Sequence, residues 1–212
     1  MTVLDYGATM CRVVEVPLDD AVRAMCAGDG DAFRVVYRSV HPTLQRYLEL
    51  LVGPFDAEDV ASETWAQACR DLNRFDGDAD GFRGWVTTIG RHRALDHLRR
   101  QSRRPQVARD LTGIEVESAT DLLASVDESL GTAAAVALIR TLPQAQAEAV
   151  MLRAVMGLDA RTSGQILGRR PGAVRTAAQR GLATLARLLE QRERSTRHER
   201  DVFSPRGAEE MR

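Results

Sequence analysis

The chain has 212 residues, of which 44% are hydrophobic and 28% are charged, and its formal net charge is −1. These values are typical of a folded protein with one large or two small domains, and they exclude a chain that is disordered throughout. No apolar run approaches the roughly 20 residues of a membrane span and no secretion signal is recognisable, so we expect no membrane insertion. Three widely spaced cysteines form no metal-ligand pair, which favours a reduced protein in the cytoplasm: Cys11, Cys26 and Cys69.

The N-terminal part starts with a segment that lacks clear periodicity. We interpret residues 1–27 as a short leader that can be disordered. From residue 31 to residue 53, apolar side chains recur at threes and fours, which predicts a helix. Pro42 is expected to kink this helix or to split it in two, because proline lacks the N–H that a helix interior needs.

The second predicted helix, which starts at Asp56 as a candidate N-cap, carries acidic side chains near its beginning. Glu58, Asp59 and Glu63 complement the positive end of the helix dipole, which is the simplest explanation for them. Asp59 and Glu63 are nevertheless like charges at i,i+4, an arrangement that costs a little free energy in isolation. A basic protein partner would explain why both are present.

The third predicted helix follows a loop from Asp76 to Gly81, with aromatic side chains at its start and basic ones further along. Four basic side chains recur at intervals of four, three and four residues and share one face: Arg93, His97, Arg100 and Arg104. Such a face is tolerated when a polyanion lies along it. Phe82 and Trp85 beside a polar loop suit single-stranded nucleic acid. The alternative is that both rings, Trp85 above all, pack in the core and the arginines form a solvated surface.

Charge is strongly segregated along the sequence. Residues 83–109 contain eight arginines and one acid, residues 110–128 contain six acids and no base, and residues 161–200 contain ten arginines and three acids. Two basic blocks around an acidic one predict two surfaces for a polyanion. We interpret the weakly periodic, acidic stretch between them as a linker.

The C-terminal part shows four helical patterns, over residues 132–142, 143–157, 160–168 and 169–194. The last two form a short helix, a glycine-containing turn and a longer basic helix, which is the arrangement of a DNA-binding helix-turn-helix. An ordinary bundle with a solvated arginine face is the alternative. Side chains projecting from the long helix or its entry are candidates for base contacts: Arg169, Arg170, Arg175, Thr176, Gln179 and Arg180. Its apolar face is predicted to consist of Val174, Leu182, Leu185 and Leu189.

Neither strand patterns nor catalytic motifs are present. The four histidines lack metal-ligand spacing, and no phosphate-binding loop or nucleophile motif occurs. We therefore predict an all-α protein with two small helical domains joined by a flexible acidic linker. We expect no enzyme activity, no cofactor and no metal.

Two segments resemble a known family. DAEDVASETWAQACRDLNRFDGDADGFRGWVTTIGRHRALDHLRR resembles region 2 of the extracytoplasmic-function (ECF) sigma factors of the sigma-70 family. LPQAQAEAVMLRAVMGLDARTSGQILGRRPGAVRTAAQRGLATLARLL resembles their region 4. The order of the two motifs and the short linker between them make the resemblance specific. It implies a leader (1–27), region 2 (28–104), a linker (105–130), region 4 (131–194) and a polar tail (195–212).

The resemblance implies an alternative sigma factor that directs RNA polymerase core to promoters. The start of the second helix would bind the clamp helices of core through Asp56, Glu58, Asp59 and Glu63. Region 2 would recognise and melt the −10 element, and the linker would follow polymerase channels. The implied −10 contacts are Asn73, Arg74, Phe75, Asp76, Arg83, Trp85, Thr88, Arg91, Arg93, His97, Arg100 and Arg104. Region 4 would bind the flap and read the −35 element through Arg169, Arg170, Ala173, Arg175, Thr176, Gln179 and Arg180.

The family also implies regulation by a partner. We expect an anti-sigma factor, and a monomer when no partner is bound. Ser163 and Gly164, which depart from the family pattern, predict an intrinsically weak first helix in the helix-turn-helix. Two other functions stay open at this stage: a free-standing helix-turn-helix regulator that binds duplex DNA without polymerase, and an adaptor that sequesters core polymerase.

Overall fold

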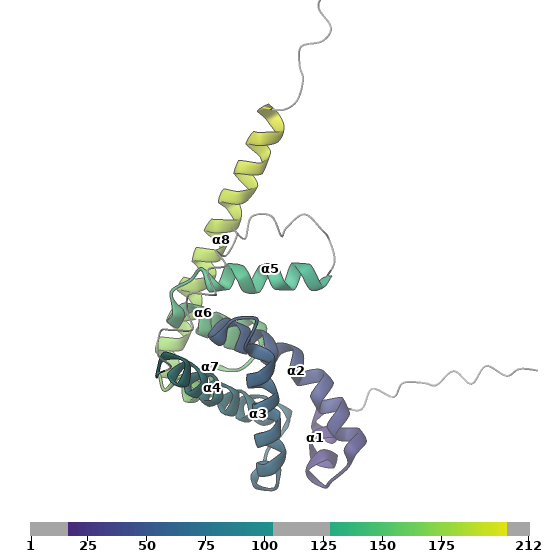
Figure 1. The fold of residues 1–212 in the computed structure, drawn as a ribbon. Helices are drawn as coiled ribbons and strands as arrows, with labels where there is room; N and C mark the ends of the chain where they lie inside the picture. Colours follow the sequence, from purple (N-terminus) through teal and green to yellow (C-terminus); the bar gives the residue numbers. More distant parts are fainter. Residues whose placement is uncertain (1–16, 104–127, 203–212) are drawn as a thin grey trace, which may run out of the picture.

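The computed structural model describes residues 17–103 and 128–202, and all its regular elements in these ranges are helical (Figure 1). Helices α1 to α4 form an N-terminal domain and α5 to α8 a C-terminal domain, as the all-α prediction requires. The C-terminal part of the last helix, α8, projects away from both domains, whereas the rest of this helix packs against α6 and α7 (Figure 1). No helix in the described part of the chain is both long enough and apolar enough to cross a membrane.

The N-terminal domain packs its four helices around a single aliphatic and aromatic core. The helices are α1 (Leu18–Cys26), α2 (Gly30–Val52), α3 (Ala57–Asp71) and α4 (Ala79–Arg103), with a short 3-10 turn η1 (Leu72–Arg74) after α3. Most of the large side chains that are fully buried in this core come from α2, α3 and α4, and include Leu44, Leu48, Val60, Phe82 and Val86.

Helix α1 lies within the segment that the sequence assigns to a leader, so the expectation of disorder is wrong for residues 18–26. Ala21, Val22 and Met25 are buried in the N-terminal core. Asp19 Oδ1 also accepts a hydrogen bond of 2.8 Å from the backbone N–H of Ala79. The nine-residue length explains the difference, because two helical turns are too few to show a reliable period.

Helix α2 runs unbroken through Pro42, so the expected split does not occur. The ring is exposed. Burial of Val36, Val40 and Leu44 on both sides of Pro42 offsets the missing backbone hydrogen bond. The helix ends where predicted, at Gly53, whose φ of 89° suits glycine.

Helix α4 starts earlier than expected, inside the segment predicted to be a loop. Asp78 Oδ1 accepts a hydrogen bond of 2.7 Å from the N–H of Gly81, so Asp78 caps the first turn. The polar composition that suggested a loop is therefore in part a capping signal, and the loop that remains spans residues 75–78.

The C-terminal domain contains α5 (Glu128–Arg140), α6 (Gln144–Val150), a π-helical turn η4 (Met151–Val155), α7 (Ala160–Leu167) and α8 (Pro171–Val202). Helix α5 begins inside the predicted linker, whose other residues lie outside the described ranges. Helix α8 continues to Val202, past the point where a polar tail was predicted. Leu182 and Leu189 are about half exposed, so they do not belong to the buried face assigned to them, whereas Val174 is buried.

The two domains are in direct contact. Tyr47 of α2 is completely buried, and it packs among the apolar side chains of the C-terminal domain. Helix α4 also packs against α7. The sequence predicted two domains joined by a linker and contained no indication of this contact.

Candidate polymerase and DNA interfaces

The C-terminal domain has the geometry of a helix-turn-helix. Asp159 caps α7 by accepting a hydrogen bond of 2.7 Å from the N–H of Thr162, and this bond lowers the pKa of Asp159. Gly168 ends α7 in the left-handed conformation, with φ of 63°. A Cβ at Gly164 would lie 2.6 Å from the carbonyl oxygen of Arg169. The glycine that predicted a weak helix is therefore required for the close approach of the turn.

The N-terminal part of α8 presents its polar face to solvent. Val174, Ala178 and Gly181 are buried on the opposite side. The residues predicted to contact the −35 element are all exposed: Arg169, Arg170, Ala173, Arg175, Thr176, Gln179 and Arg180. The structure thus gathers them at the entry and first turns of one helix, the part of a recognition helix that reaches base edges.

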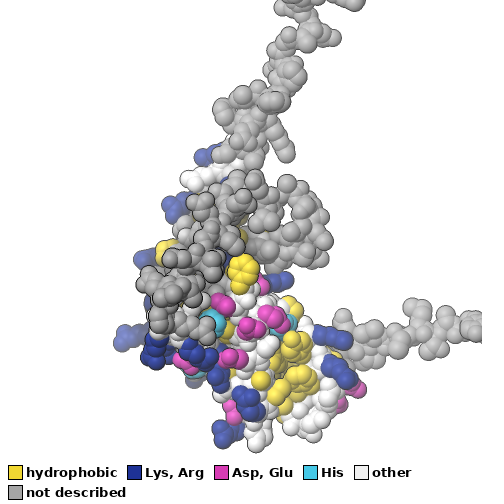
Figure 2. Space-filling model, viewed as in Figure 1, with side chains coloured by type: hydrophobic (Ala, Val, Ile, Leu, Met, Phe, Trp, Pro, Cys, Tyr) yellow, Lys and Arg dark blue, Asp and Glu magenta, His cyan; other side chains and the backbone are white. Residues whose placement is uncertain are grey.

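The acidic side chains predicted to contact polymerase lie at the start of α3. Glu58, Asp59 and Glu63 are exposed, whereas Asp56 is half-buried. Figure 2 shows acidic side chains gathered on one face of the molecule, close to hydrophobic ones. Asp56 occupies the N-cap position of α3, as predicted, but its side chain makes no capping hydrogen bond. Its Oδ2 atom lies instead 3.2 Å from Nε2 of His97.

Phe55, in the turn before α3, is a candidate that sequence analysis missed. Its exposed fraction is 90%, whereas most phenylalanines in folded proteins are buried. It directly precedes the acidic residues of α3. The sequence did contain an indication that Phe55 is exposed. This aromatic residue stands between Pro54 and Asp56, outside every periodic apolar pattern.

The basic face of α4 lies against α3 and is partly neutralised there. Arg93 Nη2 donates a hydrogen bond to Oε1 of Gln67, and Arg100 Nη1 lies 3.8 Å from Oε1 of Glu63. With the His97–Asp56 contact, three members of the face have partners on α3 or at its start. The fourth, Arg104, lies outside the described residues. Protein groups therefore neutralise part of the positive charge for which the sequence suggested a polyanion or solvent.

The segment between α3 and α4 combines exposed polar groups with a supporting aromatic cluster. Asn73, Arg74 and Asp76 are exposed. Phe75 is half-buried, with its ring centroid 5.3 Å from that of Phe82 and 5.2 Å from that of Trp85. Trp85 itself packs against the N-terminal core, as one of the two interpretations of this ring expected. Arg83 forms an ion pair with Asp80.

Two of the predicted −10 residues lie on the side of α4 that faces the C-terminal domain. Thr88 is half-buried and donates a hydrogen bond of 2.8 Å to the carbonyl oxygen of Gly84. Arg91 Nε donates a hydrogen bond of 3.0 Å to Oε2 of Glu148, and Tyr47 Oη donates one of 3.3 Å to the same oxygen. We call Tyr47, Arg91 and Glu148 the interdomain cluster. The structure therefore does not place Arg91 on an open surface.

The electrostatics of the interdomain cluster keep the Tyr47 hydroxyl protonated and the Arg91 guanidinium charged. Burial, and then the nearby carboxylate of Glu148, raise the pKa of Tyr47, so its hydroxyl stays protonated and donates. Burial opposes the charged form of Arg91, but the hydrogen bond and charge of Glu148 outweigh it and raise the pKa of the guanidinium. Gln144 Nε2 donates to the second carboxylate oxygen at 3.2 Å.

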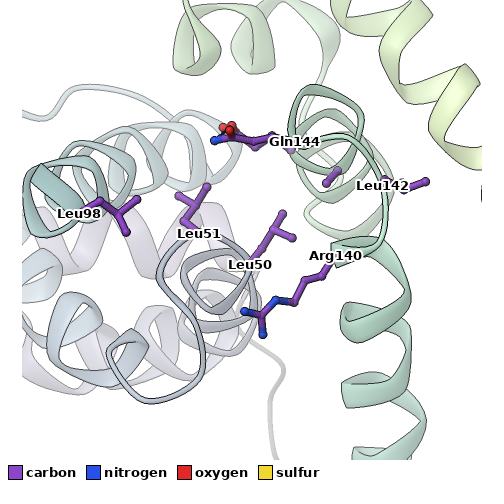
Figure 3. Close-up of a pocket in the computed structure, with 8 residues that line it drawn as sticks. Leu50, Leu51, Leu98, Arg140, Leu142 and Gln144 are labelled. Carbon is purple, nitrogen blue, oxygen red and sulfur yellow. Dashed lines mark hydrogen bonds between the residues drawn. The ribbon is translucent and has the colours of Figure 1, made fainter. Parts of the chain in front are cut away.

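A cavity of 290 Å³ lies beside this cluster, between the two domains (Figure 3). Its walls are leucines from both domains together with polar side chains from α5 and α6: Leu50, Leu51, Leu98, Arg140, Leu142, Gln144, Ala147 and Glu148. In Figure 3, Leu50 and Leu51 lie across the cavity from Arg140, Leu142 and Gln144. Within residues 17–103 and 128–202, no cluster of three His, Cys, Asp or Glu side chains is arranged to hold a metal.

The two described cysteines, Cys26 and Cys69, are free and exposed. Partial burial, followed by the charge of Asp76, raises the pKa of the Cys26 thiol. Partial burial also raises the pKa of the Cys69 thiol, although Arg70 opposes this shift. Both thiols are therefore poorer sources of reactive thiolate than a free cysteine.

Comparison with known proteins identifies the protein family to which the chain belongs. A model of sigma-70 region 2 matches residues 36–104 and a model of sigma-70 region 4 matches residues 133–185, together more than half of the chain. The chain is 36% identical over 166 residues to the ECF RNA polymerase sigma factor BldN of Streptomyces coelicolor. That match covers 77% of this chain but only 62% of BldN. The chain is 33% identical over 180 residues to the ECF RNA polymerase sigma factor ShbA of Streptomyces griseus, covering 77% of this chain and 91% of ShbA.

Solved structures show the same fold. The sigma factor RpoE from Bartonella quintana, in its complex with the anti-sigma factor NepR, superimposes with a TM-score of 0.58 at 21% identity, covering 74% of this chain and 96% of RpoE. The chain thus belongs to the sigma-70 family and is an ECF RNA polymerase sigma factor. Proteins of this class direct RNA polymerase to particular promoters and are not enzymes. The N-terminal domain contains the segment that matches region 2, and the C-terminal domain contains the segment that matches region 4.

Proposed function

We propose that each domain of this sigma factor has a separate task on polymerase and promoter, with region 2 spanning residues 28–104 and region 4 spanning residues 131–194. Region 2 binds core polymerase through the exposed start of α3 and recognises and melts the −10 element. Region 4 binds the flap of polymerase and reads the −35 element through the start of α8. The observation that carries this proposal is the pairing of an exposed acidic surface on region 2 with an exposed helix-turn-helix on region 4.

The acidic surface suits a basic partner such as the clamp helices of core. Glu58 and Asp59 have no ion-pair partner among the described residues, so their charges are available. Charge complementarity at such a surface speeds association and selects the partner. Asp56 and Glu63 hold His97 and Arg100 of α4, so they also join the polymerase-binding helix to the helix assigned to DNA.

The −10 element is assigned to the segment between α3 and α4 and to α4 itself. Asn73, Arg74 and Asp76 offer exposed polar groups for an unpaired base, while Phe75 and Trp85 support the segment from below. Residues on α4 follow the neighbouring DNA backbone, as does Arg104, which lies outside the described residues: Arg83, Thr88, Arg91, Arg93, His97 and Arg100. Contacts of this kind give binding that weakens as salt rises.

We infer that the factor is monomeric and cytoplasmic between rounds of initiation and that a protein inhibitor regulates it. Support comes from RpoE of Bartonella quintana, whose structure was solved with the anti-sigma factor NepR. An inhibitor of this type acts by covering surfaces that polymerase or DNA would otherwise contact. The exposed acids of α3 and the exposed start of α8 are the surfaces that it would cover in this chain.

A binding experiment separates this proposal from a free-standing helix-turn-helix regulator. Fragmented genomic DNA is mixed with the chain alone, with core polymerase alone and with both, and specific retention is measured. We expect specific fragments to be retained when both are present and little specific binding by the chain alone. Tight, sequence-specific retention by the chain without core would favour the regulator and contradict the proposal.

Replacing Phe55 by serine is expected to weaken core binding by about tenfold, because a buried aromatic anchor at an interface is worth roughly 1–2 kcal/mol. Its 90% exposure means that the stability of the free chain should change by less than about 0.5 kcal/mol. Titration of labelled core measures the affinity and thermal melting measures the stability.

Val35→Ser is the matched control, because Val35 is a second exposed hydrophobic side chain, at 42%, and it belongs to α2 instead of the turn before α3. It should leave core affinity unchanged. Equal effects of the two substitutions on core affinity would remove Phe55 from the proposed surface.

Replacing Arg175 by alanine is expected to weaken binding to a −35 duplex by about tenfold and to relax selectivity at one base pair, since a side chain at a base edge contributes roughly 1–3 kcal/mol. Arg187→Ala provides the control. Arg187 lies on the same helix about 18 Å further along, and it donates a hydrogen bond to Thr184. A uniform loss over all duplex sequences would mean that Arg175 contacts phosphate instead.

A further inference from the structure

The segment between α3 and α4 is folded around the ring of Phe75. A Cβ built at Gly77 would lie 3.1 Å from Cζ of this ring, and one built at Gly81 would lie 3.9 Å from the same atom. The ring also packs on Phe82 and Trp85, whose ring centroids are 5.3 Å and 5.2 Å away. Because neither glycine carries a side chain, the backbone lies close to a ring that is itself held by the N-terminal core.

The first turn of α4, directly after this segment, is held by two carboxylates. The first N–H groups of a helix have no acceptor within the helix itself. Asp78 Oδ1 accepts a hydrogen bond of 2.7 Å from the N–H of Gly81, which is a local cap. Asp19 Oδ1 accepts one of 2.8 Å from the N–H of Ala79, although Asp19 lies 60 positions earlier in the chain. A charged acceptor at the positive end of a helix gives a stronger hydrogen bond than a neutral one.

Asp19 can hold α4 because α1 is fixed to the core of its own domain. Ala21, Val22 and Met25 of α1 are buried, and this helix packs against both α2 and α4. Ala79 is 6% exposed, so its N–H has little access to water that could replace the carboxylate. The hydrogen bond therefore joins two elements of one core, and its loss would leave a donor without its acceptor.

The other end of α1 also lies near the segment. Cys26 is the last residue of this helix, and the negative charge of Asp76 contributes, after burial, to raising the pKa of its thiol. An influence of this kind needs a short separation, because water and salt screen distant charges. Asp76 is one of the exposed residues that we assign to the −10 element. Helix α1 thus borders the segment near Asp76 as well as at Ala79.

Asp20, the neighbour of Asp19, has a different partner. Its carboxylate forms an ion pair with Arg23, three positions further along the same helix. Both side chains of this pair are exposed, and such pairs contribute little to stability. The two adjacent carboxylates therefore carry the same charge at the start of α1, but it is Asp19 that contacts α4.

A segment that reads an unpaired base gains selectivity when it is fixed before the base arrives. It loses less conformational entropy on binding than a segment that the DNA must order. It also rejects a wrong base more strongly, because its polar groups are left unpaired instead of rearranging. Asn73, Arg74 and Asp76 carry such groups, and they are followed within a few residues by Ala79. Movement at the start of α4 would therefore displace them.

We propose that Asp19 is a positioning residue for the segment from Asn73 to Asp78, and that it sharpens the selectivity of this segment for an unpaired base of the −10 element. The carboxylate does not touch DNA but fixes the first turn of α4, into which the segment leads. Helix α1 precedes residues 36–104, so the part of the chain that matches region 2 does not include it. The inference rests on the proposed function for the task of the segment, whereas the contact between Asp19 and Ala79 is tested without DNA.

The test compares three variants of the full chain. Asp19→Ala removes the acceptor, whereas Asp19→Asn keeps an oxygen in the same place. Asp20→Ala removes the neighbouring carboxylate, whose partner is Arg23. All three variants lose one negative charge at the start of α1. A difference between Asp19→Ala and the other two therefore reports on the hydrogen bond to Ala79 and not on charge.

Amide hydrogen exchange in the free chain measures the contact itself. We expect exchange at Ala79 to be about tenfold faster in Asp19→Ala, because the N–H loses its acceptor. Exchange in Asp19→Asn and in Asp20→Ala should stay close to the wild-type rate. Equal exchange at Ala79 in the wild type and in Asp19→Ala would show that the carboxylate does not hold α4, and the proposal would be wrong.

Strand selection by the complex with core polymerase measures the effect on base reading. Each variant is bound to core and mixed with a library of random single-stranded DNA, and the retained strands are sequenced. The strand that the wild type enriches most is then titrated beside a scrambled strand of the same composition, which measures binding to phosphates alone.

We expect Asp19→Ala to lower the ratio of the two strand affinities by about tenfold, the order of effect of one good hydrogen bond. Asp19→Asn should restore most of the ratio, and Asp20→Ala should leave it unchanged, with equal core affinity throughout. An Asp19→Ala variant that selects as sharply as the wild type, or an Asp19→Asn variant that selects as poorly as Asp19→Ala, would overturn the positioning role. A wild type that enriches no strand would instead contradict the proposed function, and the positioning role would fall with it.

Discussion

Asp59→Arg is expected to abolish binding to core polymerase, with a loss of affinity of more than about 100-fold, or roughly 3 kcal/mol. Asp59 is exposed on the first turn of α3, and no described residue forms an ion pair with it. Its replacement therefore removes an attraction and adds a repulsion without breaking a contact inside the protein. Titration of core with the labelled variant measures the loss.

Glu190→Arg is the matched control for Asp59→Arg. It makes the same change in net charge on an exposed side chain of α8, far along the helix from the −35 residues. Its core affinity should stay within about threefold of wild type, since surface charges away from an interface act mainly on long-range attraction. If Asp59→Arg behaved like this control, the acidic start of α3 would not be the polymerase-binding surface.

Gly164→Ala is expected to destabilise region 4 by about 2–3 kcal/mol and to remove −35 binding with it, because overpacking against a fixed backbone has this order of cost. The added Cβ would lie 2.6 Å from the carbonyl oxygen of Arg169. That oxygen belongs to the turn between α7 and α8, so relief of the clash moves the recognition helix. Urea unfolding followed by circular dichroism measures the stability.

Gly172→Ala is the control for Gly164→Ala. It shows whether the loss of stability comes from the packing at residue 164 or from replacement of any glycine by alanine. A Cβ at Gly172 meets no described atom within 4 Å, and alanine is the better helix former. We expect unchanged or slightly increased stability. Equal unfolding curves for the two alanine variants would mean that the turn is not as tightly packed as the structure shows.

The helices of both domains could be predicted from the sequence because their apolar residues recur with a helical period. Leu44 and Leu48 in α2 and Val60 and Thr64 in α3 mark faces that the structure buries. The helix-turn-helix could also be predicted, because Gly168 ends one helix just before the next begins. Family resemblance added the assignment of each helix to polymerase or DNA.

Features that depend on residues far apart in the sequence could not be predicted from it. Tyr47 and Glu148 are 101 positions apart, and each fits an ordinary pattern within its own helix. Nothing in the sequence indicates that Tyr47 leaves the core of its own domain. The basic face of α4 shows the same limit, because its spacing revealed a shared face but not the presence of Gln67 and Glu63 opposite it.

Run-off transcription with core polymerase tests the central claim most directly. The purified chain is added to cognate core on fragmented genomic DNA, and start sites are mapped. We expect specific transcripts whose start sites share sequence elements near −10 and −35, and their loss with Asp59→Arg. A chain that binds core but yields no specific transcript, or transcripts identical to those from core alone, would contradict the assignment of promoter-specific initiation.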